Sequence, residues 1–184
     1  VKRDPGVAFL IDGHFDLGEL LTIGGNFSQR QADYHRLEER LGTGDHSLQY
    51  SLNFKLNPNK FFREKFFTMP INLKYNKSIS SPKYKPGSDI ILGEIDNTPD
   101  SLKTLKDYVT LYTTLQPELS NLDKENLLYS YLIDNTKINY TYKWENSSNP
   151  TTFKEELFSH QLNLDYTIKF EKNEWFLFKD LIES

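Results

Sequence analysis

Apolar and polar residues alternate along several segments of this chain, and the alternation is clearest between Ser47 and Leu56. Every second residue from Leu48 to Leu56 is apolar, and the residues between them are polar. A period of two places the apolar side chains on one face of a β-strand. Roughly ten residues tilted near 45° are also long enough to cross the hydrocarbon core of a membrane. The segment is therefore predicted to be a strand with one apolar face.

The same period returns at intervals along the chain. It is strong around Ile71, Ile138 and Leu162 and weaker before Phe27, where the pair Gly24-Gly25 predicts a bend or bulge. The spacing between the segments indicates strands joined by loops. The predicted strands lie near residues 20–30, 47–57, 68–79, 109–116, 127–144 and 157–170.

Residues 101–116 fit two periods. Leu102, Leu105 and Val109 have helical spacing, whereas Val109, Leu111 and Leu115 also fit one face of a strand. We expect a short helix over residues 100–107 that begins after Pro99, with Asp100 or Ser101 as its cap, followed by a strand.

Composition agrees with alternation rather than with a helical bundle. Apolar residues make up 37% of the chain and the mean hydropathy is −0.63, yet aromatic residues reach 14%. The predicted fold class is all-β: an antiparallel meander that forms a segment of a large transmembrane β-barrel, with one short loop helix. No linker divides the chain, so residues 1–184 are predicted to be one barrel segment. Its long outer loops are predicted at 31–46, 80–107 and 145–156.

The alternation assigns each side chain to one of two faces. In a membrane barrel the apolar face contacts lipid and the polar face lines a wet lumen. The predicted lipid-facing residues are Leu48, Tyr50, Leu52, Phe54, Leu56, Ile138, Tyr140, Tyr142, Leu162, Leu164, Tyr166 and Ile168. The predicted lumen-facing residues are Gln49, Asn53, Lys55, Asn139, Lys143, Asp165 and Lys169. The alternative is a soluble β-sandwich or half-barrel whose apolar faces pack together.

Two aromatic clusters lie between or after the predicted strands. Aromatic side chains gather at membrane interfaces, because their amphipathic rings prefer the headgroup region. Strands that alternate in direction place both clusters on the same rim, provided that the weak strand at Val109 exists; without it they would lie on opposite rims. The predicted interface aromatics are Phe61, Phe62, Phe66, Phe67, Trp175, Phe176 and Phe178.

Charge and residue content argue against several other functions. The formal net charge is −4 and the pI is about 5.6, so nucleic acid is not an expected partner. The absence of Cys excludes disulfides and thiolate metal sites. No apolar run reaches the length of a membrane-spanning helix. The start Val1-Lys2-Arg3-Asp4-Pro5, without Met or a signal sequence, suggests an excerpt of a longer chain or a processed product.

Candidate chemistry is weak. The run Asp12-Gly13-His14-Phe15-Asp16 could offer metal ligands, but without a second cluster we favour a turn. Asp33-Tyr34-His35 lacks a nucleophile in a recognisable setting, and Gly42-Thr43-Gly44 is too short to cradle phosphate. The sequence predicts no catalytic residue, no metal and no cofactor, and therefore no enzyme.

Three segments carry a resemblance to a known family. They are residues 26–57, residues 69–90 with the element Pro82-Lys83-Tyr84-Lys85-Pro86, and the stretch from Ile133-Asp134-Asn135 to the cluster at Trp175. In order and spacing they resemble the barrel region of the SprA family of Bacteroidota, the outer-membrane translocon of gliding motility and type nine secretion. The resemblance covers roughly residues 20–181.

The resemblance implies part of a channel in the bacterial outer membrane that exports folded proteins to the cell surface. The implied partners are outer-membrane lipid, the remainder of the parent barrel, secreted protein cargo and other secretion-system components. Members of this family are much longer than this chain, and five or six strands cannot close a barrel wide enough for a folded protein. The alternative function is that of a soluble periplasmic or surface β-domain that binds a partner or glycan through Trp144 and Tyr84.

Overall fold

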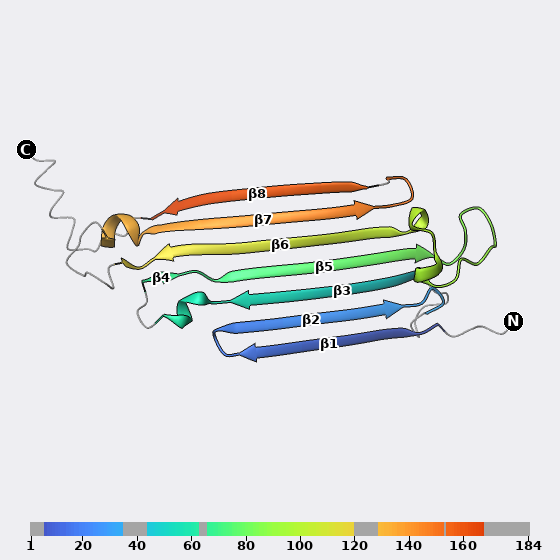
Figure 1. Cartoon of the computed structure of the whole chain (residues 1–184), viewed down its shortest axis with the longest axis horizontal. Coiled ribbons are helices and arrows are strands. Elements are labelled where there is room, and N and C mark those ends of the chain that lie inside the picture. Colours follow the sequence, from blue (N-terminus) through green and yellow to red (C-terminus); the bar gives the residue numbers. More distant parts are fainter. Residues whose placement is uncertain (1–5, 35–43, 63–65, 120–128, 153, 168–184) are drawn as a thin grey trace, which may run out of the picture.

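The computed structural model describes residues 6–34, 44–62, 66–119, 129–152 and 154–167, and they form a long antiparallel sheet (Figure 1). The strands follow one another across the sheet, apart from the short β4, which pairs with the end of β6. The strands are β1 (Ala8–Leu17), β2 (Leu21–Arg30), β3 (Asp45–Leu56), β4 (Phe67–Thr68), β5 (Ile71–Pro82), β6 (Thr104–Pro117), β7 (Thr136–Ser148) and β8 (Glu155–Tyr166).

The fold is all-β, and the sheet is open. Its order is β1-β2-β3-β5-β6-β7-β8, and every neighbouring pair is antiparallel. Within the described residues, β1 and β8 are the two edges (Figure 1). Six successive antiparallel pairings make β1 and β8 run in the same direction. A direct contact between these two edges would therefore be parallel, unlike every other pairing in the sheet.

The described helices are short and lie at the ends of the sheet. They are the 3₁₀ helices η1 (Pro58–Phe61), η2 (Ile95–Asn97) and η3 (Asp100–Leu102), together with the π-helix η5 (Tyr129–Ile133). The helix predicted over residues 100–107 is wrong beyond η3, because Thr104 pairs with Ser80 and opens β6. Its predicted cap is also wrong: Pro99 occupies the N-cap position and no side chain caps the helix.

The strands match the sequence pattern best where alternation is unbroken. β2 and β3 lie within two residues of the predicted segments 20–30 and 47–57. The bulge predicted at Gly24 and Gly25 is absent, because both residues keep the register opposite Asn53 and Leu52. The pairing between β2 and β3 therefore continues without interruption through the two glycines.

Several predicted boundaries are wrong. The predicted strand 68–79 is divided into β4 and β5 by Met69 and Pro70, because proline cannot donate a ladder hydrogen bond. β6 begins at Thr104 rather than near 109, which shortens the predicted loop 80–107. The predicted strand 127–144 contains η5 and instead begins at Thr136 and continues to Ser148. The predicted loop 145–156 is correspondingly shorter, since β7 ends at Ser148 and β8 begins at Glu155.

The sequence missed β1 altogether. The run Asp12–Asp16, interpreted as a turn, lies inside this strand, and Asp12 faces Asn26 while His14 faces Gly24. Asp12 accepts a hydrogen bond from the Asn26 amide. Leu10 and Gly13 interrupt the alternation of β1, which is why its pattern is weak. Pairing with β2 over ten residues stabilises a segment that local propensity does not favour.

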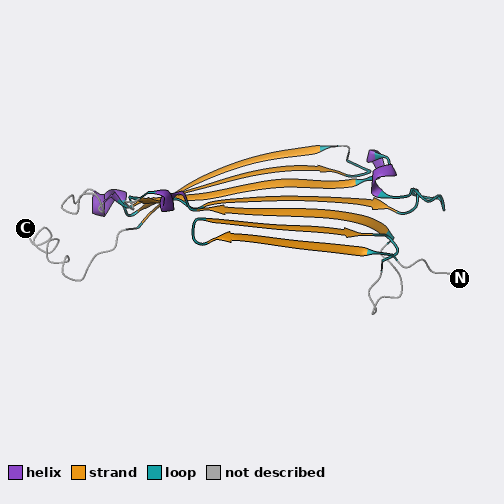
Figure 2. Cartoon of the chain, turned by 60° about the horizontal axis from the view of Figure 1, so that its bottom comes forward, coloured by secondary structure: helices purple, strands orange, loops and turns teal. Residues whose placement is uncertain are grey.

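The sheet is one layer thick (Figure 2). Among the described residues, the buried ones are Ala32, Ser81, Ile95 and Thr98. Ser81 lies near the end of β5, Ala32 follows β2, and Ile95 and Thr98 belong to the loop that contains η2, all at the same end of the sheet. The described part of the chain therefore contains no hydrophobic core under the sheet. Both of its faces are left to contact something other than these residues.

Candidate functional site

The cross-strand register separates the side chains of the sheet into two faces. Residues that lie opposite one another in neighbouring strands point to the same side of a sheet. The apolar face, as defined here, carries the side chains of Phe9, Ile11, Phe15, Leu17, Leu21, Ile23, Phe27, Leu48, Tyr50, Leu52, Phe54, Leu56, Ile71, Leu73, Tyr75, Ile79, Leu105, Val109, Leu111, Leu115, Ile138, Tyr140, Tyr142, Trp144, Phe158, Leu162, Leu164 and Tyr166.

The predicted faces agree with this register wherever the structure describes them. Leu52 of β3 is opposite Tyr75 of β5, which is opposite Val109 of β6. Ile138 of β7 is opposite Leu164 of β8. Every described residue predicted to face lipid thus lies on the apolar face, and every described residue predicted to face the lumen lies on the other, polar face. Ile168 and Lys169 fall outside the described residues.

The apolar face is open to its surroundings at the edge strands and in the middle. Leu162 and Leu164 expose 69% and 68% of their surface, and Leu52 exposes 44%. Soluble monomers rarely expose a contiguous apolar patch larger than a few hundred Å². A face that extends over seven strands of this length is far larger than that, so it requires an apolar partner.

Aromatic contacts run along one end of the apolar face. The ring centroids of Phe9 and Phe27 are 6.4 Å apart, and those of Phe27 and Tyr50 are 5.9 Å apart in a stacked arrangement. Near the other edge of the same face, between β7 and β8, Trp144 donates its indole N–H to Glu156 over 3.0 Å. Neither Phe27 nor Trp144 is among the predicted membrane-interface aromatics; Trp144 is expected at a contact only in the alternative soluble domain. The sequence alone does not reveal the neighbours of these two aromatic residues, because these depend on the register between strands.

Polar residues also enter the apolar face. Lys77, Asp107, Asn146 and Glu156 lie in one row across β5, β6, β7 and β8. His160 of β8 is a second exception: its Nδ1 lies 3.0 Å from the hydroxyl of Tyr140. Alternation of apolar and polar residues does not place these five polar side chains on the apolar face; their position follows from the register between strands.

The polar face is a network of hydrogen-bonding side chains with interspersed charges of both signs. Asn139 accepts a hydrogen bond from the Thr114 hydroxyl over 2.8 Å and donates one to Asp165 over 2.6 Å. Lys74 and Lys143 lie on this face on either side of Thr110. Such a surface suits water and transient polar contacts rather than a dry interface.

One of the two predicted aromatic clusters is described. Phe62, Phe66 and Phe67 form it, with ring centroids 4.8 to 5.5 Å apart, while Phe61 is exposed. The β6 strand on which the rim argument depends exists. Trp175, Phe176 and Phe178 fall outside the described residues, so the agreement between the two rims stays a prediction.

A folded corner joins the loops at the other end of the sheet. Lys83 donates to both carboxylate oxygens of Asp33, over 2.6 and 2.7 Å, while its backbone N–H donates to Gly44 and its carbonyl accepts from Leu92. The hydrogen bond that Lys83 donates to the Asp33 carboxylate raises the pKa of Lys83 above its ordinary value. The contact links the segment after β2 to the segment after β5.

We expect Lys83→Met to loosen this corner. The pair is partly exposed, so its loss should cost only about 0.5 to 1 kcal/mol locally. Amide hydrogen exchange at Lys83 and Leu92 should accelerate, and Lys85→Met, which alters an exposed neighbour, should leave it unchanged. Because the pKa of Lys83 is raised, the wild-type pair should persist until the pH exceeds the ordinary lysine value of 10.5. Equal rates of amide hydrogen exchange in the two variants would show that the ion pair between Lys83 and Asp33 does not hold the corner together.

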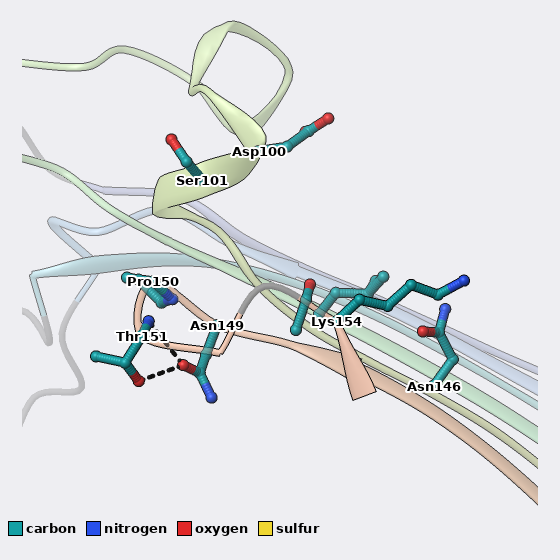
Figure 3. A pocket seen from close by; sticks show the side chains of 9 residues that line it. Asp100, Ser101, Asn146, Asn149, Pro150, Thr151 and Lys154 are labelled. Carbon is teal, nitrogen blue, oxygen red and sulfur yellow. Dashed lines mark hydrogen bonds between the residues drawn. The ribbon is translucent and has the colours of Figure 1, made fainter. Parts of the chain in front are cut away.

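A shallow hollow lies beside the connection from β7 to β8 (Figure 3). Asn149 organises this connection: its side-chain oxygen accepts hydrogen bonds from the N–H groups of Thr151 and Thr152 and from the Thr151 hydroxyl. This is an Asx turn, a structural use of Asn. Asp100, Ser101 and Lys154 are among the polar residues that line the hollow, and among these described residues no hydrogen bond joins Ser101 to either charged one (Figure 3).

The described segments bring together no group of three or more His, Asp or Glu side chains that could hold a metal ion. The candidate metal run at Asp12–Asp16 lies along a strand, with Asp12, His14 and Asp16 at successive positions of the polar face.

In the parts of the chain that the structure describes, no helix has both the length and the apolar character needed to span a membrane.

Comparison with known proteins gives no further assignment: no family model matches the chain, and no curated protein matches it.

Proposed function

We propose that this chain forms part of the wall of an outer-membrane channel that exports folded proteins to the cell surface, as in type nine secretion and gliding motility. The observation that carries the proposal is the uncovered apolar face, which continues across every long strand while the opposite face is polar. Lipid is the partner that can cover such a face without supplying a second protein layer.

The lengths of the strands support this assignment. The long strands contain 10 to 14 residues. A membrane strand of an outer-membrane barrel needs about 9 to 11 residues when it is tilted near 45°. The strands of this sheet are long enough to cross the bilayer and project slightly beyond it.

The open edges support a role as a segment rather than a complete pore. A barrel of about eight strands has an interior filled by side chains, and porins of 16 to 18 strands enclose only a channel for small solutes. A conduit for folded proteins needs more strands than this sheet has. Because β1 and β8 run in the same direction, an odd number of further strands would allow antiparallel closure throughout.

The polar face is the surface we assign to the passing cargo. Ser, Thr, Asn and Gln side chains with charges of both signs offer weak, exchangeable contacts, whereas a strongly charged wall would retain proteins of opposite charge. Family resemblance to the SprA translocon directs this proposal toward protein cargo. The geometry of the sheet alone supports a membrane wall.

Site-specific photo-crosslinking tests the proposal. A photoreactive amino acid at Thr110, on the polar face, should capture secreted proteins in cells that produce the assembled protein. The same group at Leu111 is the matched control, since Leu111 is next in the chain and lies on the apolar face. We expect cargo adducts at Thr110 and none at Leu111. Cargo adducts at neither position, or equally at both, would contradict the assignment of the polar face.

A further inference from the structure

The apolar face does not occupy the same rows in all strands. One row of directly opposed residues contains, from β1 to β8, Ile11, Phe27, Tyr50, Lys77, Asp107, Asn146 and Glu156. Its first three members are apolar and belong to the aromatic end of the face. Its last four are polar. In the next row toward the loops, Phe9 of β1 and Leu48 of β3 are apolar whereas Ser148 of β7 is polar. At the loop end, the border of the apolar face therefore lies farther from the loops on β7 and β8 than on β1 and β3.

The opposite border is displaced in the same direction. On β1, β2 and β3 the apolar face ends with the row of Leu17, Leu21 and Leu56, next to a turn and η1. On β6, β7 and β8 it continues by one further row, Leu115, Ile138 and Leu164, and on β8 by another, which contains Tyr166. Both borders thus shift by up to two rows across the sheet.

A few residues depart from this border. Ile79 and Leu105 are opposite one another in the row beyond Lys77 and Asp107, at the loop end. Leu105 also lines the hollow beside Asp100 and Pro150, so it has loop residues as neighbours. Gln29 is the polar exception on the β2 side of the same row. The displacement is carried by the remaining strands on both borders.

We infer that the strands cross the bilayer at an angle and that Lys77, Asp107, Asn146 and Glu156 lie in the lipid headgroup layer, while Ile11 in the same row lies within the hydrocarbon. This inference rests on the proposed membrane function. Two rows correspond to four residues, or about 13 Å along a strand, and six strand spacings correspond to about 29 Å. The ratio gives a tilt of about 25° between the strands and the membrane normal.

Amphipathic side chains occupy the new border. Tyr75, Trp144 and Phe158 lie in the row next to the polar residues, on the hydrocarbon side. Trp144 directs its N–H to Glu156, which keeps the indole ring beneath the headgroup layer and its polar atom at the border. This is the position that Trp and Tyr prefer at membrane interfaces.

A soluble sandwich offers no reason for this arrangement. A second sheet would cover the apolar face as an area and could tolerate polar residues at any rim. A bilayer instead imposes two flat, parallel borders on every strand that crosses it. Oblique borders in the frame of the sheet become flat borders when the strands are tilted. Strands of outer-membrane barrels tilt by about 35° to 45°, which is more than the roughly 25° that these two borders give.

Depth-dependent fluorescence quenching tests the inference in the assembled protein. Single cysteines at Ile11, Phe27, Asn146 and Glu156, all in one row, receive a small fluorophore, and lipids with a nitroxide in the headgroup or in mid-chain serve as quenchers. We expect mid-chain quenching to dominate at Ile11 and Phe27 and headgroup quenching at Asn146 and Glu156. The fluorophore depths of the two groups should differ by about 10 Å. Two positions in each group guard against one variant that does not assemble.

The outcomes separate the inference from the proposed function. Equal depths at all four positions would overturn the tilt but leave the membrane wall intact. Quenching by neither lipid would overturn both. A cysteine at Asn53, on the polar face, is the control and should show weak quenching by both lipids, because it faces the lumen.

Discussion

Leu52→Arg is expected to reduce assembly of the protein in the membrane more than any other single change that we consider. Leu52 lies at mid-strand on the apolar face, between Gly25 of β2 and Tyr75 of β5. An arginine that faces lipid near the bilayer midplane costs roughly 2 to 4 kcal/mol. A long side chain could reach the interface only by bending along the sheet. The measurement is the fraction of protein in outer membranes that resists protease and that migrates as the folded form in SDS gel electrophoresis of unheated samples.

Asn53→Arg is the matched control for this variant. Asn53 is the next residue of β3 and lies on the polar face, opposite Gly24 and Lys74. An arginine there remains in water, so we expect assembly close to that of the parent protein, lowered slightly by the like charge of Lys74. If Leu52→Arg assembled as well as Asn53→Arg, the two faces would be assigned the wrong way round or the sheet would not contact lipid.

The unbroken alternations of the sequence predicted the sheet well, for a physical reason. From Ser47 to Leu56 of β3 every polar-face residue is polar and every apolar-face residue is apolar, and a shift by one residue would expose the whole apolar set to water. Side-chain period and register therefore determine each other in that strand. The same holds for the part of β7 around Tyr140 and Tyr142.

Prediction was wrong where pairing overrides local pattern. β1 contains Asp12 and Gly13, which are disfavoured in strands, yet its hydrogen bonds to β2 and the aromatic contact of Phe9 with Phe27 hold it in the sheet. The spacing of apolar residues predicts a helix over Thr104 to Asp107, but these residues pair with β5. Local spacing contains no information about a partner strand that is distant in the sequence.

The candidate surface divides in the same way. Membership of each face was predictable from parity within a strand. The borders of the apolar face were not, because they depend on how far each strand is displaced against its neighbours, which hairpin length and loop structure determine. Lys77 and Asp107 are a case in point: each interrupts its own strand, but only the register places them side by side.

The chain in isolation is expected to aggregate in water and to dissolve in detergent. The described sheet lacks a core, exposes Leu162 and Leu164 on one face and leaves β1 and β8 as long edge strands. Exposed apolar surface and unpaired strand edges both promote association. We expect most of the purified chain to sediment without detergent, to remain in solution in detergent micelles and to show no cooperative thermal unfolding in water.

The opposite result would change the interpretation of the whole molecule. A soluble monomer with a cooperative melt requires that its apolar face be covered, and the described residues provide nothing that covers it. Such a result would favour the soluble β-domain, in which exposed Tyr84 becomes a candidate for partner or glycan contact. If detergent micelles replace the lipid around the apolar face, the chain should instead dissolve in detergent and show more β-structure by circular dichroism. Leu52→Arg alone would not separate the two interpretations, because a buried sandwich core and a lipid-facing wall both reject arginine. The dependence of the parent chain on detergent separates them, since only the wall needs detergent to stay in solution.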